Sequence, residues 1–167
     1  MPYSKSLTSM FVLFFGFLAF CQTTQVNSVT GVPDYILYTF FFNRVMWLQD
    51  QAGKVQSQGQ DPSQFSTQIE KQAGLTSQQA SALVAIASDW RTKNAALLAQ
   101  IRAAAATGAK LATSPQLQAL QSQRHQLVLD HLTQLQTGLG PGAFYVLDLY
   151  VRRTTNVSGP GVTPPGN

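Results

Sequence analysis

The chain has 167 residues, of which 44% are hydrophobic and 11% are charged, and its formal net charge is +4. This length suits one domain with one core, and a weak, scattered positive charge argues against a nucleic-acid partner. Glutamine, a good helix former without charge, supplies much of the polarity of the predicted helices.

Residues 1–21 are typical of a secretory signal peptide. A polar start containing Lys5 leads into an apolar run over residues 10–20, which has the length of a signal core and is too short to span a bilayer. The small-x-small sequence of residues 19–21 predicts cleavage after Cys21, the only cysteine. We therefore expect a periplasmic or secreted protein whose mature form has no thiol chemistry.

The same junction has a second interpretation. Residues 18–21 resemble a lipoprotein box, in which Cys21 would carry a lipid, although Phe20 is large where that box prefers a small residue. An uncleaved anchor is a third interpretation, and the short apolar run argues against it. Contact with a membrane is expected only through the signal peptide or through a lipid on Cys21.

After a flexible leader at residues 22–32, the pattern predicts a helical domain over residues 33–153. Proline in the first turn marks three helix starts, at Pro33, Pro62 and Pro115, and Pro141 marks a fourth. Glycine marks the ends. The predicted helices cover residues 34–58, 62–73, 77–107, 115–137 and 141–153.

The corner around Gly74 carries the clearest start signal. Gly74 ends one helix in a left-handed conformation, Leu75 is placed as a hydrophobic staple, and Thr76 with Gln79 matches a capping box. The pattern recurs at residues 136–140, so a second corner of this kind is expected at Gly138.

The fold class is predicted to be all-α. Residues 77–107 and 115–137 carry apolar stripes at three-and-four spacing and should form a long antiparallel helix pair. An aromatic N-terminal helix and two short helices should pack against this pair. No segment alternates like a strand between hairpin turns, and the tail at residues 154–167, rich in proline and glycine, should be disordered.

The segment Leu75-Thr76-Ser77-Gln78-Gln79 also reads Leu-Thr-x-x-Gln. An exported, helical, cysteine-poor chain of this size with that motif resembles the Spy- and CpxP-like periplasmic family. The resemblance implies a bent helical cradle, often dimeric, that holds unfolded clients or signals envelope stress. Residues 139–143 lack the Thr and Gln of the family's second motif, and charged residues are sparser than is usual in the family, so fold transfers better than function.

Residues that commonly carry catalysis are sparse. His125 and His131 are six positions apart, about 120° from alignment on a helix, which does not suit a metal pair. Glu70 is the only glutamate, no serine lies in a nucleophile elbow, and there is no glycine-rich phosphate loop. We expect no enzyme, no metal site and no cofactor.

His131 and Arg124 fall on the apolar stripe of the predicted fourth helix. We expect both at the edge of the core, each bound to a carbonyl or to an acid such as Asp89 or Asp130.

The most unusual part of the predicted mature chain is the aromatic stretch at residues 35–48, which Asn43 and Arg44 interrupt. Because Phe40, Phe41 and Phe42 are consecutive, they cannot all face inward, and at least one should be exposed or covered by a second subunit. Burial in the core is the first interpretation of the stretch; a dimer interface or client surface is the second. The candidate partner-binding residues are Phe40, Phe41, Phe42, Trp47 and Trp90.

The sequence favours an exported, noncatalytic helical binding protein, chaperone-like or stress-responsive, whose partners are protein clients or a second copy of the chain. The alternative is a structural or assembly component of the cell envelope that acts as an oligomer. An enzyme would require an acid and His131 to converge in a pocket.

Overall fold

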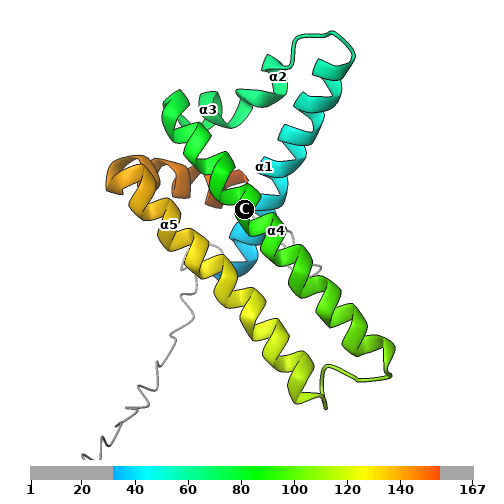
Figure 1. Ribbon diagram of the computed structural model, residues 1–167. Coiled ribbons are helices and arrows are strands. Elements are labelled where there is room, and N and C mark those ends of the chain that lie inside the picture. The colour runs from blue at the N-terminus through cyan, green and yellow to red at the C-terminus, as the bar shows by residue number, and fades with distance from the viewer. Residues whose placement is uncertain (1–31, 155–167) are drawn as a thin grey trace, which may run out of the picture.

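The computed structural model describes residues 32–154, which contain helices and no strand (Figure 1). The predicted all-α class is confirmed. The signal segment with Cys21, nearly all of the leader, and the tail beyond Thr154 lie outside the described residues. The helices are α1 (Asp34–Ser57), α2 (Ser63–Ser66), α3 (Gln68–Ala73), α4 (Ser77–Ala106) and α5 (Pro115–Thr154).

The long antiparallel pair is formed by α4 and α5, which run side by side in Figure 1 and share the most extensive interface of the fold. Helix α1 crosses α4 in this view and packs against both members of the pair. Beyond this crossing the pair continues as a two-helix projection (Figure 1). The part of it beyond the residues that meet α1, residues 95–123, is called here the outer hairpin. No helix within residues 32–154 is long and apolar enough to cross a membrane.

The start of α4 follows the predicted capping box. The hydroxyl oxygen of Thr76 accepts the N–H of Gln79 at 3.3 Å, and the side-chain oxygen of Gln79 accepts the N–H of Thr76 at 2.9 Å. Gly74, with φ of 63°, ends α3 in the left-handed conformation, and Leu75 is buried in the core. These contacts satisfy backbone groups that a helix end otherwise leaves unpaired.

The second predicted corner is wrong in position. Gly138 is helical and lies within α5, where a Cβ at this residue would stand 4.0 Å from the Cδ1 atom of Ile86 on α4. The break falls two residues later, at Gly140, with φ of 75° and ψ of 163°. Pro141 explains the difference, because proline removes a helical N–H and disfavours helical geometry in the residue before it.

The single short helix expected over residues 62–73 is also wrong, because Thr67 separates α2 from α3. The backbone at Thr67 has φ of −104° and ψ of 6°. Its hydroxyl donates to the carbonyl of Ser63 at 2.8 Å, a back-bond that competes with regular helix geometry.

The core lies where α1 crosses α4 and α5. The rings of Phe42 on α1 and Trp90 on α4 are 5.2 Å apart at the centre of this crossing. Each buried side chain of this size stabilises the fold by about 1.5–3 kcal/mol. The fully buried residues include Leu37, Tyr38, Phe41, Phe42 and Val45 from α1, Leu83, Ala87 and Trp90 from α4, and Leu135, Leu147 and Val151 from α5.

A polar network attaches the last turns of α5 to the start of α1. The hydroxyl of Tyr38 donates to Asp148 at 2.8 Å, and Arg152 donates to Asp148 at 2.7 Å and to the buried Asp34 at 3.0 Å. The guanidinium thus joins two carboxylates that are far apart in sequence.

Candidate ligand-binding site

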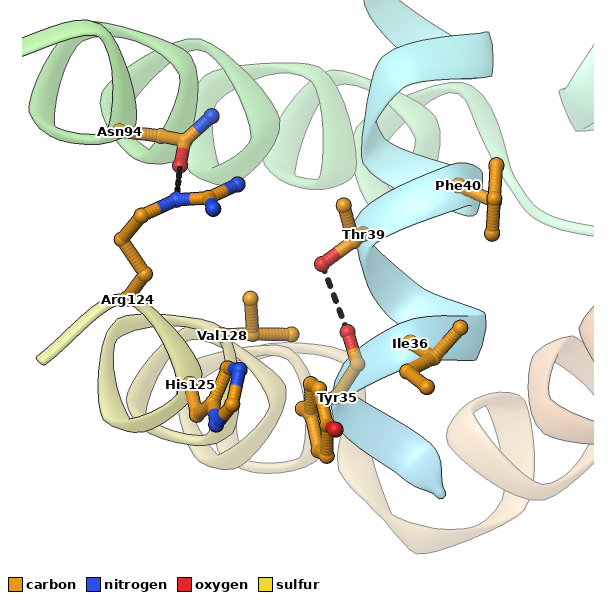
Figure 2. Close-up of a pocket in the computed structure, with 8 residues that line it drawn as sticks. All are labelled: Tyr35, Ile36, Thr39, Phe40, Asn94, Arg124, His125 and Val128. Atoms are coloured by element: carbon orange, nitrogen blue, oxygen red, sulfur yellow. Dashed lines mark hydrogen bonds between the residues drawn. The ribbon is translucent and has the colours of Figure 1, made fainter. Parts of the chain in front are cut away.

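A pocket of about 140 Å³ lies where the first turns of α1 meet α4 and α5. Figure 2 shows the side chains that line it, from three helices. Residues four positions apart on a helix share a face, which explains why α1 contributes two such pairs and α5 a third. The lining residues are Tyr35, Ile36, Thr39 and Phe40 from α1, Asn94 from α4, and Arg124, His125 and Val128 from α5.

Arg124 is the only permanently charged side chain that lines this pocket. Its Nε atom donates to the side-chain oxygen of Asn94 at 3.0 Å, and one terminal nitrogen donates to the side-chain oxygen of Gln121 at 3.1 Å. Both partners are neutral amides, and within residues 32–154 Arg124 makes no ion pair with an acidic side chain. The charge is therefore held in place without being neutralised.

His125 and Tyr35 form an aromatic wall. Their rings are stacked with centroids 3.9 Å apart and an angle of 27° between planes. Burial, followed by the neighbouring charge of Arg124, lowers the pKa of His125 below its ordinary value. The imidazole is thus neutral at neutral pH, and the positive charge of the pocket resides on Arg124.

The two ends of the pocket differ in polarity. In Figure 2, Arg124 and Asn94 lie on one side of α1, and Ile36 and Phe40 lie on the other. Between them, the hydroxyl of Thr39 donates to the carbonyl of Tyr35 at 2.6 Å and so is already engaged. The side chains of Ile36 and Phe40 therefore point away from Arg124. On the side of Arg124 the apolar surface comes from Val128 and the Tyr35–His125 stack.

The aromatic candidates from the sequence separate into two groups. Phe41, Phe42 and Trp90 are buried in the core, whereas Phe40 is 52% and Trp47 is 54% exposed. The expectation that at least one of the three consecutive phenylalanines is exposed is confirmed. Phe40 and Trp47 are seven positions apart and share one side of α1 with Ile36; these three residues are called here the aromatic face.

Trp47 also contacts α2. Its ring lies edge-on to Phe65, with centroids 6.3 Å apart. This contact orients the indole while leaving more than half of it open to solvent.

His131 is where the sequence analysis placed it. The ring is 1% exposed, Nδ1 lies 2.7 Å from the carbonyl oxygen of Leu127, and Nε2 lies 2.9 Å from a carboxylate oxygen of Asp89. It therefore has the carbonyl and the acid that were expected. Arg124 also finds carbonyl oxygens, those of the side-chain amides of Asn94 and Gln121, and within residues 32–154 it pairs with no carboxylate.

The sequence analysis did not identify the pocket. The adjacency of Arg124 and His125 on one predicted helix is visible in the sequence. Tyr35 and Asn94 lie on two other helices, and nothing in the sequence predicted that these helices bring them to Arg124 and His125. The motif residues Leu75, Thr76 and Gln79 do not line the pocket; they form the corner and cap at the start of α4.

A wider groove of about 500 Å³ lies between α1, the α2–α3 segment and α4. Its one charged lining residue is Glu70, which accepts a hydrogen bond from Ser77 at 2.8 Å. Small side chains make up most of the rest, including Ser66, Ala80, Ser81, Ala85 and Ser88.

Comparisons with protein-family models, curated proteins and solved structures gave no match for this chain. The resemblance to the Spy- and CpxP-like family therefore stays a prediction that rests on one motif.

Proposed function

We propose that this is an exported, noncatalytic helical binding protein that holds non-native protein clients on the aromatic face of α1. The observation that carries the proposal is the exposure of Phe40 and Trp47, both more than half open to solvent on a helix whose opposite side forms the core. Two large rings on one side of a helix, next to Ile36, offer an apolar surface of the kind that marks interaction sites.

The geometry of α1 supports this use. Phe41 and Phe42 fix the helix in the core, so Phe40 and Trp47 are presented on a rigid element and need no folding step before they bind. Trp47 is further held by Phe65. The low charge of the chain suits contact with apolar segments of unfolded clients, which vary in sequence and share little beyond hydrophobicity.

Suppression of client aggregation tests the proposal. Purified protein in several-fold molar excess should reduce light scattering by reduced, unfolded α-lactalbumin. The double variant Phe40→Ser/Trp47→Ser should lose most of this effect. Tyr145→Ser/Leu149→Ser is the matched control, because it removes two comparably exposed apolar side chains from α5, and it should act like the wild type.

Tryptophan fluorescence gives an independent measurement. The chain has two tryptophans, one exposed and one buried. Client binding should shift the emission of Trp47 to shorter wavelength and protect it from acrylamide, with Trp90 unaffected. No suppression by the wild type, or equal loss in the α5 control, would count against the aromatic face.

The alternative, an envelope component that acts as an oligomer, makes a different prediction. In that case light scattering should show a stable oligomer without client, and Phe40→Ser/Trp47→Ser should convert it to monomer.

A further inference from the structure

We propose that the pocket around Arg124 binds a small aromatic carboxylate, a single ring that carries one carboxylate group. This goes beyond client binding, because it assigns a small-molecule site to residues on α4 and α5 as well as α1.

The charge of the pocket calls for an anion. Arg124 is partly buried and oriented by Asn94 and Gln121, yet neither partner neutralises it. A guanidinium has five N–H donors, and these two bonds use two of them. An anion that enters the pocket would meet an oriented charge in a partly desolvated place, where a charge-assisted hydrogen bond is stronger than in water.

Asn94 makes the donor set suitable for a carboxylate. Its side-chain oxygen accepts from Arg124, so its amide N–H₂ group points elsewhere, and no hydrogen bond from that group is seen among residues 32–154. In Figure 2 the amide nitrogen of Asn94 and the terminal nitrogens of Arg124 both lie on the side toward α1. One carboxylate oxygen can face Arg124 and the other Asn94, whereas Thr39 adds no donor because its hydroxyl is used by Tyr35.

The number of charges favours a singly charged anion. His125 is neutral, because burial and the nearby Arg124 charge lower its pKa, and none of the described residues adds a second cation to the pocket. A phosphate group with two charges would be left with one unpaired in a site that is partly closed to water.

The remaining walls suit one aromatic ring. The stacked Tyr35 and His125 rings and the side chain of Val128 provide flat and apolar surface beside Arg124. The volume of about 140 Å³ is close to that of an engineered cavity of about 150 Å³ that binds benzene. Offset or edge-on contact between aromatic rings adds to the burial of the ring itself.

Titration of the ¹⁵N-labelled protein with benzoate, followed by NMR and calorimetry, tests this assignment. Benzoate should bind saturably with a Kd of about 1 mM or lower, as expected for a ligand of this size, and should shift resonances of Tyr35, His125 and Val128. Benzamide, which has the same shape without the charge, should bind at least about tenfold more weakly. At about pH 8, where inorganic phosphate is mostly doubly charged, it should neither bind at the pocket nor compete.

Two variants separate the charge from the fold. Arg124→Gln should weaken benzoate binding at least about tenfold, and Arg102→Gln, at an exposed arginine on the outer hairpin, should leave it unchanged. Asn94→Asp places a carboxylate beside Arg124; it should abolish benzoate binding while the melting temperature stays the same or rises. Because Asn94→Asp is expected to stay folded, its loss of benzoate binding tests the proposal even if Arg124→Gln unfolds.

Three results would overturn the assignment: no saturable binding at about ten times the expected Kd, equal binding of benzamide, or competition by phosphate as strong as by benzoate. None of these results bears on client binding by Trp47, so the two proposals fail separately.

Discussion

A carboxylate oxygen of Asp89, on the surface of α4, lies 2.9 Å from Nε2 of His131, a buried residue of α5. The other ring nitrogen lies 2.7 Å from the carbonyl oxygen of Leu127. Hydrogen bonds from Lys93, and next from His131, hold the pKa of Asp89 below its usual value, so Asp89 is ionised at neutral pH. Both ring nitrogens thus lie within hydrogen-bond distance of an oxygen atom.

Removal of Asp89 should therefore cost more than its surface position suggests. Asp89→Ala leaves Nε2 of a buried ring unpaired, and we expect a loss of about 1–3 kcal/mol in the free energy of unfolding by urea. The double variant Asp89→Ala/His131→Leu should recover most of this loss, because no buried polar atom is then left without a partner. Lys93→Ala, the exposed partner of Asp89, should cost under about 0.5 kcal/mol. An Asp89→Ala protein as stable as the wild type would contradict the contact.

Ionisation of Tyr38 should lower the free energy of unfolding at alkaline pH. Burial, followed by the charge of Asp148, raises its pKa far above the ordinary 10.0. The folded protein keeps this proton while the unfolded chain loses it, so Tyr38 contributes stability below pH 10 that decreases as the pH rises further.

The variant Tyr38→Phe isolates this effect. It should be about 0.5–1.5 kcal/mol less stable at neutral pH, because the hydrogen bond to Asp148 is lost. Above pH 10 the gap to the wild type should narrow by about 1.4 kcal/mol per pH unit. Urea unfolding at a series of pH values measures both, and a constant gap would show that Tyr38 ionises in the folded state.

Replacement of Gly140 and of Gly142 by alanine should change the stability of the fold in opposite directions. Gly140 has φ of 75° and ψ of 163°, a conformation that residues with a Cβ rarely adopt, so Gly140→Ala should destabilise by about 1–3 kcal/mol. Gly142 is helical, and a Cβ there meets nothing within 4 Å, so Gly142→Ala should stabilise by about 0.4–1 kcal/mol. Thermal unfolding compares the two, and a neutral Gly140→Ala would place the break elsewhere.

Thr76 distinguishes a cap from a functional motif. If its role is the capping box, Thr76→Ala should cost about 0.5–2 kcal/mol and Thr76→Ser should restore most of it. Suppression of client aggregation should be unchanged at a temperature where both variants are folded. Loss of suppression in folded Thr76→Ala would instead favour the role that the family resemblance implies.

Local signals in the sequence predicted the helix starts and the burial pattern well. These signals act within a few residues, so they can be interpreted without knowledge of the tertiary structure. They are proline in a first turn, the capping box at Thr76 and the consecutive phenylalanines. Gly138 was misread because a glycine can lie within a helix as well as end one, and Pro141 fixes the break at Gly140 instead.

The pocket could not be predicted for a related reason. Tyr35 and His125 are far apart in sequence and stack because α1 crosses the pair at one particular angle. A carbonyl or an acid was expected beside Arg124, and only the structure shows that the partners are the amide oxygens of Asn94 and Gln121. The cationic character of the site thus depends on which neutral groups α4 and α5 happen to bring beside it.

The two halves of α4 should differ in local stability, because only the first half packs in the core. Between residues 91 and 114 only Ala104 is buried, whereas Leu83, Ala87 and Trp90 fix the first turns of α4 in the core. Amide protons near Trp90 should exchange with solvent only through global unfolding, and those of residues 103–106 through local opening at the tip. The tip can therefore separate and close again while the body that carries the aromatic face stays folded.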